Sequence, residues 1–204
     1  AKGTTVAVTI TINEYNLNTG TTLTYNESNA NAMAASTEFK GFNYGNNAST
    51  NPNPLELINA HKAYGYGLTG DGEVIAIMDG GFNVNHIEFS DKTITTFGTL
   101  STATSSSYHG TSVASFAAGE DDGLYMQGVA PAADLHFSDY AEIGSYTYDA
   151  NHLADATDDA STAAAQNNSW GCEYQIDDLK TYIANNGYTN ITGLHAFFRD
   201  LCGM

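Results

Sequence analysis

The pattern of apolar and polar positions separates the start of the chain from the remainder. Residues 4–12 and 21–25 alternate β-branched or apolar residues with polar ones, which predicts a hairpin or a pair of edge strands. Residues 26–54 are small and polar, and they predict a linker or a loosely packed arm. We therefore expect a β-rich N-terminal extension or linker over residues 1–50, followed by a main domain over residues 51–204.

Short apolar runs alternate with helical spacings from Pro54 onward. Residues 73–78 form an apolar run that ends before Asp79, as expected for a strand buried on both faces. Pro54 in a first helical turn, with Asn53 as its cap, predicts the start of a helix. Further strands are predicted at 134–137 and 166–170, and further helices at 109–118, 153–165, 176–184 and 191–201. Strands that alternate with helices indicate an α/β fold with a parallel sheet covered on both faces.

The charge of the chain excludes some classes of partner. It carries 6 Lys and Arg against 23 Asp and Glu, a net charge of −17, whereas nucleic-acid binding needs a basic face. Solubility explains most of these carboxylates, and cation binding is the alternative for some of them. No apolar stretch is long enough to span a membrane. The abundance of Thr, Asn, Gly, Ser and Tyr favours a secreted or cell-surface protein, and a start at Ala1 suggests a processed or excised form.

The chain has two cysteines, Cys172 and Cys202. A pair is compatible with one disulfide in an oxidising compartment, and equally with two buried thiols. Their spacing fits no zinc motif.

Two short segments carry the candidate chemistry. Asp79 directly follows a predicted strand, and functional groups of parallel sheets gather at the carboxyl ends of strands. His109 opens a predicted helix of small residues, which can bring an imidazole close to other backbone. The acid precedes the histidine, which is the order in one class of Asp–His–Ser hydrolases. The alternatives are that Asp79 caps the next segment or binds a metal, and that His109 caps its helix or lies in the core.

Five blocks in order resemble the subtilisin-like serine proteases, the subtilase or S8 family. The blocks are 58–79, with the first helix and the strand of the catalytic Asp; 80–89, similar to "DSG…HPDL"; 109–115, similar to "HGTHVAG" except at Ser112 and Ser115; 128–135, similar to "GVAP…A.L"; and 167–171, similar to "NxSxG". The resemblance covers residues 54–170, a little over half of the chain, and leaves out residues 1–50. It implies an incomplete three-layer parallel sheet of the subtilisin type, with residues 51–204 as the N-terminal portion of a catalytic domain.

The resemblance implies a role for each matched residue. Asp79 would orient His109 and stabilise its imidazolium, and His109 would take the proton of a serine and return it to the leaving amine. Ser169, Trp170 and Gly171 would form an edge strand that pairs with the backbone of a protein or peptide substrate. Trp170 would line a subsite, or alternatively pack in the core. We expect the side chains of Asp79 and His109 to lie within hydrogen-bonding distance.

The family often binds a structural calcium ion near the histidine helix. The matching ligands here would be the carboxylates of Glu88 and Asp122, and the main-chain carbonyls of Glu120, Leu124 and Met126. The alternative is a solvated acidic loop.

The third member of the triad has no counterpart in the sequence. No nucleophile turn and no "AAGN"-like oxyanion turn follows His109, and Ser169 belongs to the substrate-strand motif. We expect a fragment of a serine endopeptidase that supplies Asp and His, with the serine in a C-terminal remainder or a second chain. The alternative is a non-catalytic structural or interaction protein on a degenerate or truncated subtilase scaffold. A phosphate- or metal-dependent protein using Asp79 is a third hypothesis, against which the absence of a phosphate loop counts.

Overall fold

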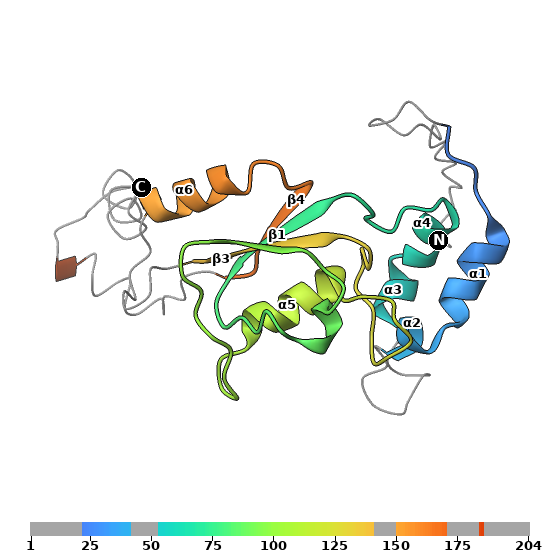
Figure 1. Cartoon of the computed structure of the whole chain (residues 1–204), viewed down its shortest axis with the longest axis horizontal. Coiled ribbons are helices and arrows are strands. Elements are labelled where there is room, and N and C mark those ends of the chain that lie inside the picture. Colours follow the sequence, from blue (N-terminus) through green and yellow to red (C-terminus); the bar gives the residue numbers. More distant parts are fainter. Residues whose placement is uncertain (1–21, 42–52, 141–149, 171–183, 186–204) are drawn as a thin grey trace, which may run out of the picture.

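The computed structural model of the chain describes residues 22–41, 53–140, 150–170 and 184–185. Its centre is a parallel sheet with the strand order β2–β3–β1–β4. The strands are β1 (Val74–Asp79), β2 (Ile94–Phe97), β3 (Asp134–Asp139) and β4 (Ala165–Asn168). Helix α5 (His109–Ala118) packs on one side of the sheet and α6 (Ala150–Asp159) lies on the other (Figure 1). The predicted α/β fold with a covered parallel sheet is confirmed.

The main core lies between the sheet and α5. Alternate residues of a strand face opposite sides, so Leu135 and Phe137 of β3 point toward α5 while His136 points toward α6. The ring of Phe137 stacks on Phe82, with a centroid distance of 4.6 Å. The other buried members are Ile77, Phe89, Ala114, Ala118 and Ala133. Small residues on α5 bring its backbone close to the sheet and so place His109 near the carboxyl end of β1.

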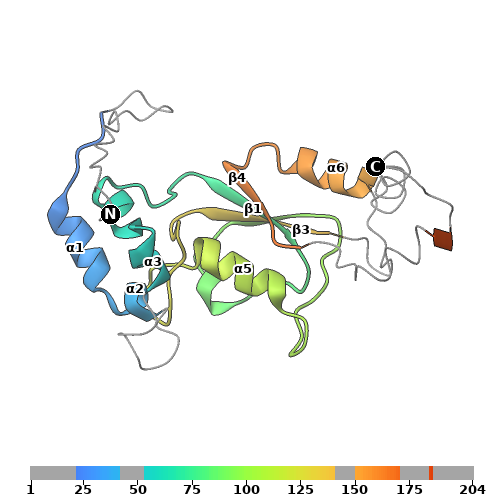
Figure 2. The same cartoon turned by 180° about the vertical axis from the view of Figure 1, so that it is seen from behind.

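The arm predicted over residues 26–54 is wrong in the part that the structure describes. Its polar sequence folds into α1 (Glu27–Ala35) and α2 (Thr37–Gly41), and α1 lies against α4 (Ala60–Gly65), as Figure 2 shows. Buried Phe39 of α2 joins a second apolar cluster with Leu55, Ala60 and Tyr64. Residues 27–41 are therefore mostly helical and packed, not a β-rich or loose arm.

The helix that begins at Pro54 is short, and one predicted helix boundary is wrong. Asn53 caps the helix at Pro54 as predicted, α3 covers only Pro54–Leu57, and α4 starts after Asn59, which has a left-handed φ of 57°. The helix predicted over 153–165 is observed as α6 over Ala150–Asp159, and the backbone from Ala165 pairs with β1 as strand β4.

Two observed elements were not predicted, and several predicted elements lie outside the residues that the structure describes. Strand β2 was not predicted, and neither was the short 3₁₀ helix η1 (Ile87–Phe89). Residues 23–25, within the second alternating run, are not in a strand. The first alternating run, most of the helix at 176–184, the helix at 191–201 and both cysteines lie outside the described residues. In the described part, no helix is both long and apolar enough to cross a membrane.

Candidate active site

Asp79 ends the buried strand β1, at the carboxyl edge of the sheet. Its side chain is 2% exposed, and its Oδ1 accepts the N–H of Gly80 at 2.7 Å. Gly81 follows with φ 79°, and a Cβ there would lie 2.5 Å from the carbonyl oxygen of Ser107. Only glycine fits both the backbone angle and the space, so the chain can turn sharply directly after the acid.

His109 meets this carboxylate from the first turn of α5. Its Nδ1 lies 2.9 Å from Oδ1 and 3.0 Å from Oδ2 of Asp79. A carboxylate only accepts, so Nδ1 carries the hydrogen and the lone pair of a neutral ring lies on Nε2. The imidazole is 63% exposed while the Asp79 side chain is buried. The predicted proximity of the two side chains is confirmed.

The N-terminus of α5 is bound to the turn that carries Asp79. Gly110 N–H donates to the Gly80 carbonyl at 2.7 Å, and the Thr111 hydroxyl donates to the Gly81 carbonyl at 2.9 Å. A Cβ on Gly110 would lie 2.8 Å from the Phe82 ring, so a larger residue would push the helix away. The small residues after His109 thus set the distance between imidazole and carboxylate.

Two of the three residues predicted to bind substrate follow strand β4, which is parallel to β1 and ends at the same edge of the sheet. Ser169 follows β4 and its hydroxyl accepts from the Asn167 side chain at 2.7 Å. Trp170 is half-buried and packs on Tyr140, with ring centroids 5.7 Å apart. Gly171 lies outside the described residues.

Tyr140 is a site residue that the sequence analysis missed. It directly follows β3 as Gly80 follows β1, and its N–H donates to the Asp79 carbonyl at 3.2 Å. A Cβ on Gly80 would lie 3.0 Å from its ring, so the ring fills the space above that glycine. A position directly after a strand would have marked Tyr140 as a candidate. The apolar pattern predicts a strand that ends at Phe137, however, whereas β3 continues to Asp139.

The described residues contain no serine hydroxyl that is hydrogen-bonded to His109. The Ser101 hydroxyl accepts instead from Gly81 N–H at 2.7 Å.

The acidic group beside η1 consists of Glu88 with the nearby carboxylates of Glu120 and Asp122, and the predicted ligands Leu124 and Met126 follow in the same loop. Glu88 is 4% exposed and its Oε2 has no hydrogen-bond partner among the described residues. Burial, with the nearby charges of Asp122 and Glu120, raises the pKa of Glu88 to about 7, although a hydrogen bond from Met126 N–H opposes this. The Glu120 carboxylate binds elsewhere, accepting from the Ser90 hydroxyl at 2.5 Å and from Asp91 N–H at 3.0 Å.

Glu38 is a further acid of this region that the sequence analysis missed. It comes from α2, is 1% exposed, and its Oε1 accepts from Leu124 N–H at 2.6 Å and Asp122 N–H at 3.1 Å. Burial and the nearby carboxyl group of Asp121 raise the pKa of Glu38 to about 7. No sequence signal marked it, because it lies in a stretch that predicted a linker.

The fit of this region to a cation is partial. Buried Oε2 atoms of Glu38 and Glu88 lack partners within the described residues, which a cation would supply. Yet no three His, Cys, Asp or Glu side chains of that part of the chain are grouped to hold a metal. A calcium ion here would therefore rely on main-chain carbonyls for most of its ligands, as the predicted set does.

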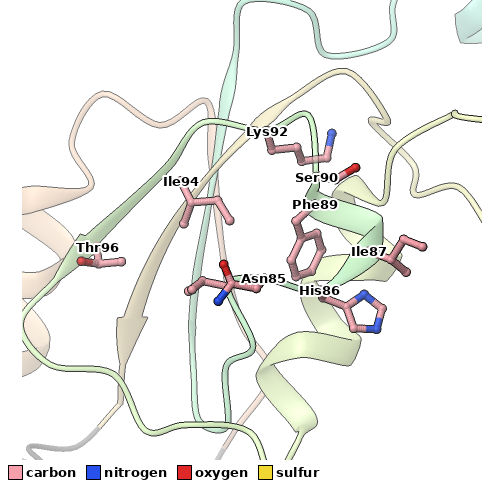
Figure 3. Close-up of a pocket in the computed structure, with 9 residues that line it drawn as sticks. Asn85, His86, Ile87, Phe89, Ser90, Lys92, Ile94 and Thr96 are labelled. Carbon is pink, nitrogen blue, oxygen red and sulfur yellow. The ribbon is translucent and has the colours of Figure 1, made fainter.

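A separate cavity of about 490 Å³ opens between η1 and β2 (Figure 3). Its walls include Ile87, Phe89 and Ile94, and the amine of Lys92 turns away to donate to the Pro131 carbonyl at 2.6 Å. This cavity belongs to neither the Asp79–His109 pair nor the acidic group.

The fold is thus a parallel α/β sheet with an Asp–His pair at its carboxyl edge. Residues 70–195 match the model of the subtilase family, Peptidase_S8. The chain belongs to the subtilase family, which is a serine protease family.

Solved structures give weaker likenesses. The serine protease of Aeromonas sobria is 20% identical over 64% of this chain and 25% of that chain, with a TM-score of 0.46. Its complex with a chaperone gives 21% identity, 60% and 23% coverage and a TM-score of 0.46. A mutant of the protease domain of PatA is 26% identical over 58% of this chain and 48% of that chain, with a TM-score of 0.43. The chain spans less than half the length of each. No curated protein matches the chain.

Proposed function

We propose that this chain supplies the Asp and His of an Asp–His–Ser triad in a serine endopeptidase. The observation that carries the proposal is the bond from His109 Nδ1 to both carboxylate oxygens of Asp79, at 2.9 and 3.0 Å, on a ring that is otherwise exposed. Nε2 is then directed toward solvent, where a serine hydroxyl can reach it.

The chemistry follows from this geometry. As the serine oxygen attacks the scissile carbonyl carbon, Nε2 of His109 takes the hydroxyl proton, and the ring becomes an imidazolium. The buried Asp79 carboxylate stabilises that positive charge through Nδ1–H. When the tetrahedral intermediate collapses and the C–N bond breaks, Nε2 returns the proton to the leaving amine. Water then repeats the cycle on the acyl-enzyme.

The serine itself is proposed to come from outside the residues described here, in a C-terminal remainder or a second chain. Ser169, Trp170 and Gly171 are proposed to pair with the substrate backbone as an added strand. Support comes from the place of Trp170 against Tyr140, which contacts the backbone of Asp79. We also propose an extracellular location, on composition, and a structural calcium ion held by Glu88, Asp122 and the carbonyls of residues 120, 124 and 126.

Labelling of the native protein that contains this chain, with a serine-directed fluorophosphonate, tests the proposal. We expect labelling that His109→Ala abolishes and that Asp79→Asn slows by roughly 10⁴-fold, the loss typical when the histidine tautomer is no longer fixed. Glu73→Gln, at a half-buried acid remote from the pair, is the control and keeps the labelling rate. Labelling that is absent from the native protein, or insensitive to His109→Ala, would favour a non-catalytic scaffold.

A further inference from the structure

A second buried acid ends the strand beside β1. Asp139 is the last residue of β3, is paired in register with Asp79, and is 7% exposed. The proposed chemistry gives it no role. A carboxylate at this depth needs a hydrogen-bonding reason to be there, because burying a charge is costly unless it is paired or hydrogen-bonded.

The partner of Asp139 is the loop that holds the turn after Asp79. Its Oδ2 accepts the N–H of Ser101 at 2.8 Å. The hydroxyl of the same serine accepts Gly81 N–H at 2.7 Å, and its carbonyl accepts Phe82 N–H at 2.8 Å. Ser101 thus binds Asp139 on one side and the turn at 81–82 on the other.

Two sets of hydrogen bonds hold the backbone of the turn at Gly80–Phe82, in addition to the Tyr140 ring that packs over Gly80. The α5 N-terminus binds the carbonyls of Gly80 and Gly81, and Ser101 binds the N–H groups of Gly81 and Phe82. Without Ser101 in place, the N–H side of the turn loses both of these partners.

Asp139 is also fixed from the α6 side. Its carbonyl accepts Nε2–H of His152 at 2.8 Å, and the His152 ring lies against Phe97 of β2 at 5.6 Å. The backbone of Asp139 is therefore held in place by His152. Its carboxylate can fix the position of Ser101 because it does not move with that loop.

We propose that Asp139 is a positioning residue for the Asp79–His109 pair and that it acts through Ser101. This inference rests on the proposed function, in which that pair is the catalytic acid and base. The hydrogen-bond partners of Asp139 in the described structure include Ser101 and His152 but not His109. It holds Ser101, Ser101 holds the turn, and the turn sets the direction of the Asp79 carboxylate.

Nuclear magnetic resonance of the ring nitrogens and the Nδ1 proton of His109, in the chain as it stands, tests the inference without any need for activity. Asp139→Ala and Ser101→Ala are each expected to speed solvent exchange of the Nδ1 proton by about 5-fold, the factor expected for one ordinary hydrogen bond. The double variant should show no more than either single one, because the bond from Ser101 N–H to Asp139 and the bond from Gly81 N–H to the Ser101 hydroxyl act in series. Asp139→Asn keeps an acceptor for Ser101 N–H and should stay close to the unmodified chain.

Three results would overturn the inference. One is an unchanged Nδ1 proton in Asp139→Ala; another is additivity of the two alanine variants. The third is an Asp139→Asn effect as large as that of Asp139→Ala with none in Ser101→Ala, which would assign the role to charge. Backbone amide spectra check that each variant is folded, and Ser101→Ala changes only a half-buried hydroxyl. Asp79→Asn is the reference: if it leaves the His109 signals unchanged, the proposed function fails, whatever Asp139 does.

Discussion

His136 shows how burial controls the charge of a single residue in this fold. Its Nδ1 lies 2.9 Å from the hydroxyl of Thr95, while its Nε2 is 3.5 Å from the carboxylate of Asp159. Burial lowers the pKa of His136 from its ordinary value, and the charge of Asp159 opposes this only in part. Burial therefore favours the neutral form of His136, although the Asp159 carboxylate lies within ion-pair distance.

The pH dependence of stability follows from this shift. Because the folded-state pKa of His136 is below the unfolded value of about 6.5, the unfolded chain binds more protons as the pH falls below that value. This residue therefore lowers the free energy of unfolding on acidification, by up to about 1.4 kcal/mol per pH unit for one proton. Urea unfolding at pH 5 to 8 should show a difference between the unmodified chain and His136→Gln that shrinks or reverses toward low pH. Asp159→Asn should enlarge the loss of stability at low pH, because it removes the charge that raises the pKa of His136. A stability difference between the unmodified chain and His136→Gln that does not change with pH would contradict the prediction.

Gly81 offers a second prediction at the residue scale, with a matched control. Gly81 and Gly72 have nearly the same φ, 79° and 77°, so alanine meets the same backbone strain at both. A Cβ at Gly72 has nothing within 4 Å, whereas one at Gly81 lies 2.5 Å from the Ser107 carbonyl oxygen. Gly81→Ala should therefore lower the free energy of unfolding by about 1–3 kcal/mol more than Gly72→Ala does, which is the usual cost of forced overpacking. Urea unfolding measures the difference, and equal losses would mean that the loop at Ser107 yields freely.

Among the elements, α3 depends most on one side chain. It has only four residues, Pro54–Leu57, and its cap Asn53 accepts from Leu55 N–H at 2.9 Å. The amide of Asn53 also donates to the Phe39 carbonyl of α2, so one residue caps a helix and joins two.

Two variants of Asn53 separate these functions. Asn53→Ser keeps a capping oxygen but cannot reach Phe39, and Asn53→Ala keeps neither contact. We expect Asn53→Ala to be less stable than Asn53→Ser by about 1 kcal/mol, the usual value of an N-cap. Thermal unfolding followed by circular dichroism measures the order. If the two variants are equally stable, the cap contributes nothing and the link to α2 carries the whole effect.

An element can be predicted when its own sequence pattern determines it, and not when contacts with distant segments do. Helix α5 was predicted with its observed bounds because its small apolar residues run from His109 to a glycine stop. Helix α1 buries only Ala30, so its nine residues carry no apolar stripe, and it forms through its Asn26 cap and contact with α4. Strand β2 is four residues with two exposed threonines, so its own sequence carries little strand pattern and its pairing with β3 defines it.

The same distinction applies to the site. Asp79 and His109 were found because each belongs to a motif next to a predictable element. Asp139 and Tyr140 were missed because the apolar run of β3 ends at Phe137, while backbone pairing with β1 continues to Asp139. Pairing is a property of two distant segments, so the sequence around β3 alone could not place these residues at the edge.

For the whole molecule, the acidic loop after α5 connects parts that the sequence suggested were separate. Glu38 of α2 accepts the N–H groups of Asp122 and Leu124 in this loop, and Glu88 of η1 lies beside it. The N-terminal helices are thus attached to the main domain through buried carboxylates as well as through the apolar cluster around Phe39. Both carboxylates keep an oxygen without a partner among the described residues. A cation at the loop would stabilise the attachment of the N-terminal helices and the main domain together.

Calcium should therefore stabilise the entire chain and not only its loop. At a free concentration 100 times the dissociation constant, a ligand bound only by the folded state adds about 2.7 kcal/mol to the free energy of unfolding. We expect thermal unfolding in calcium to shift upward as one transition, with the shift removed by a chelator and largely absent in Glu88→Gln. Asp71→Asn, at an exposed acid away from the loop, is the matched control and should keep the full shift. If Glu88→Gln responds to calcium as the unmodified chain does, the ion binds elsewhere, and the acidic loop is held by protons and hydrogen bonds alone. A shift confined to a second, separate transition would instead mean that the N-terminal helices unfold independently of the sheet.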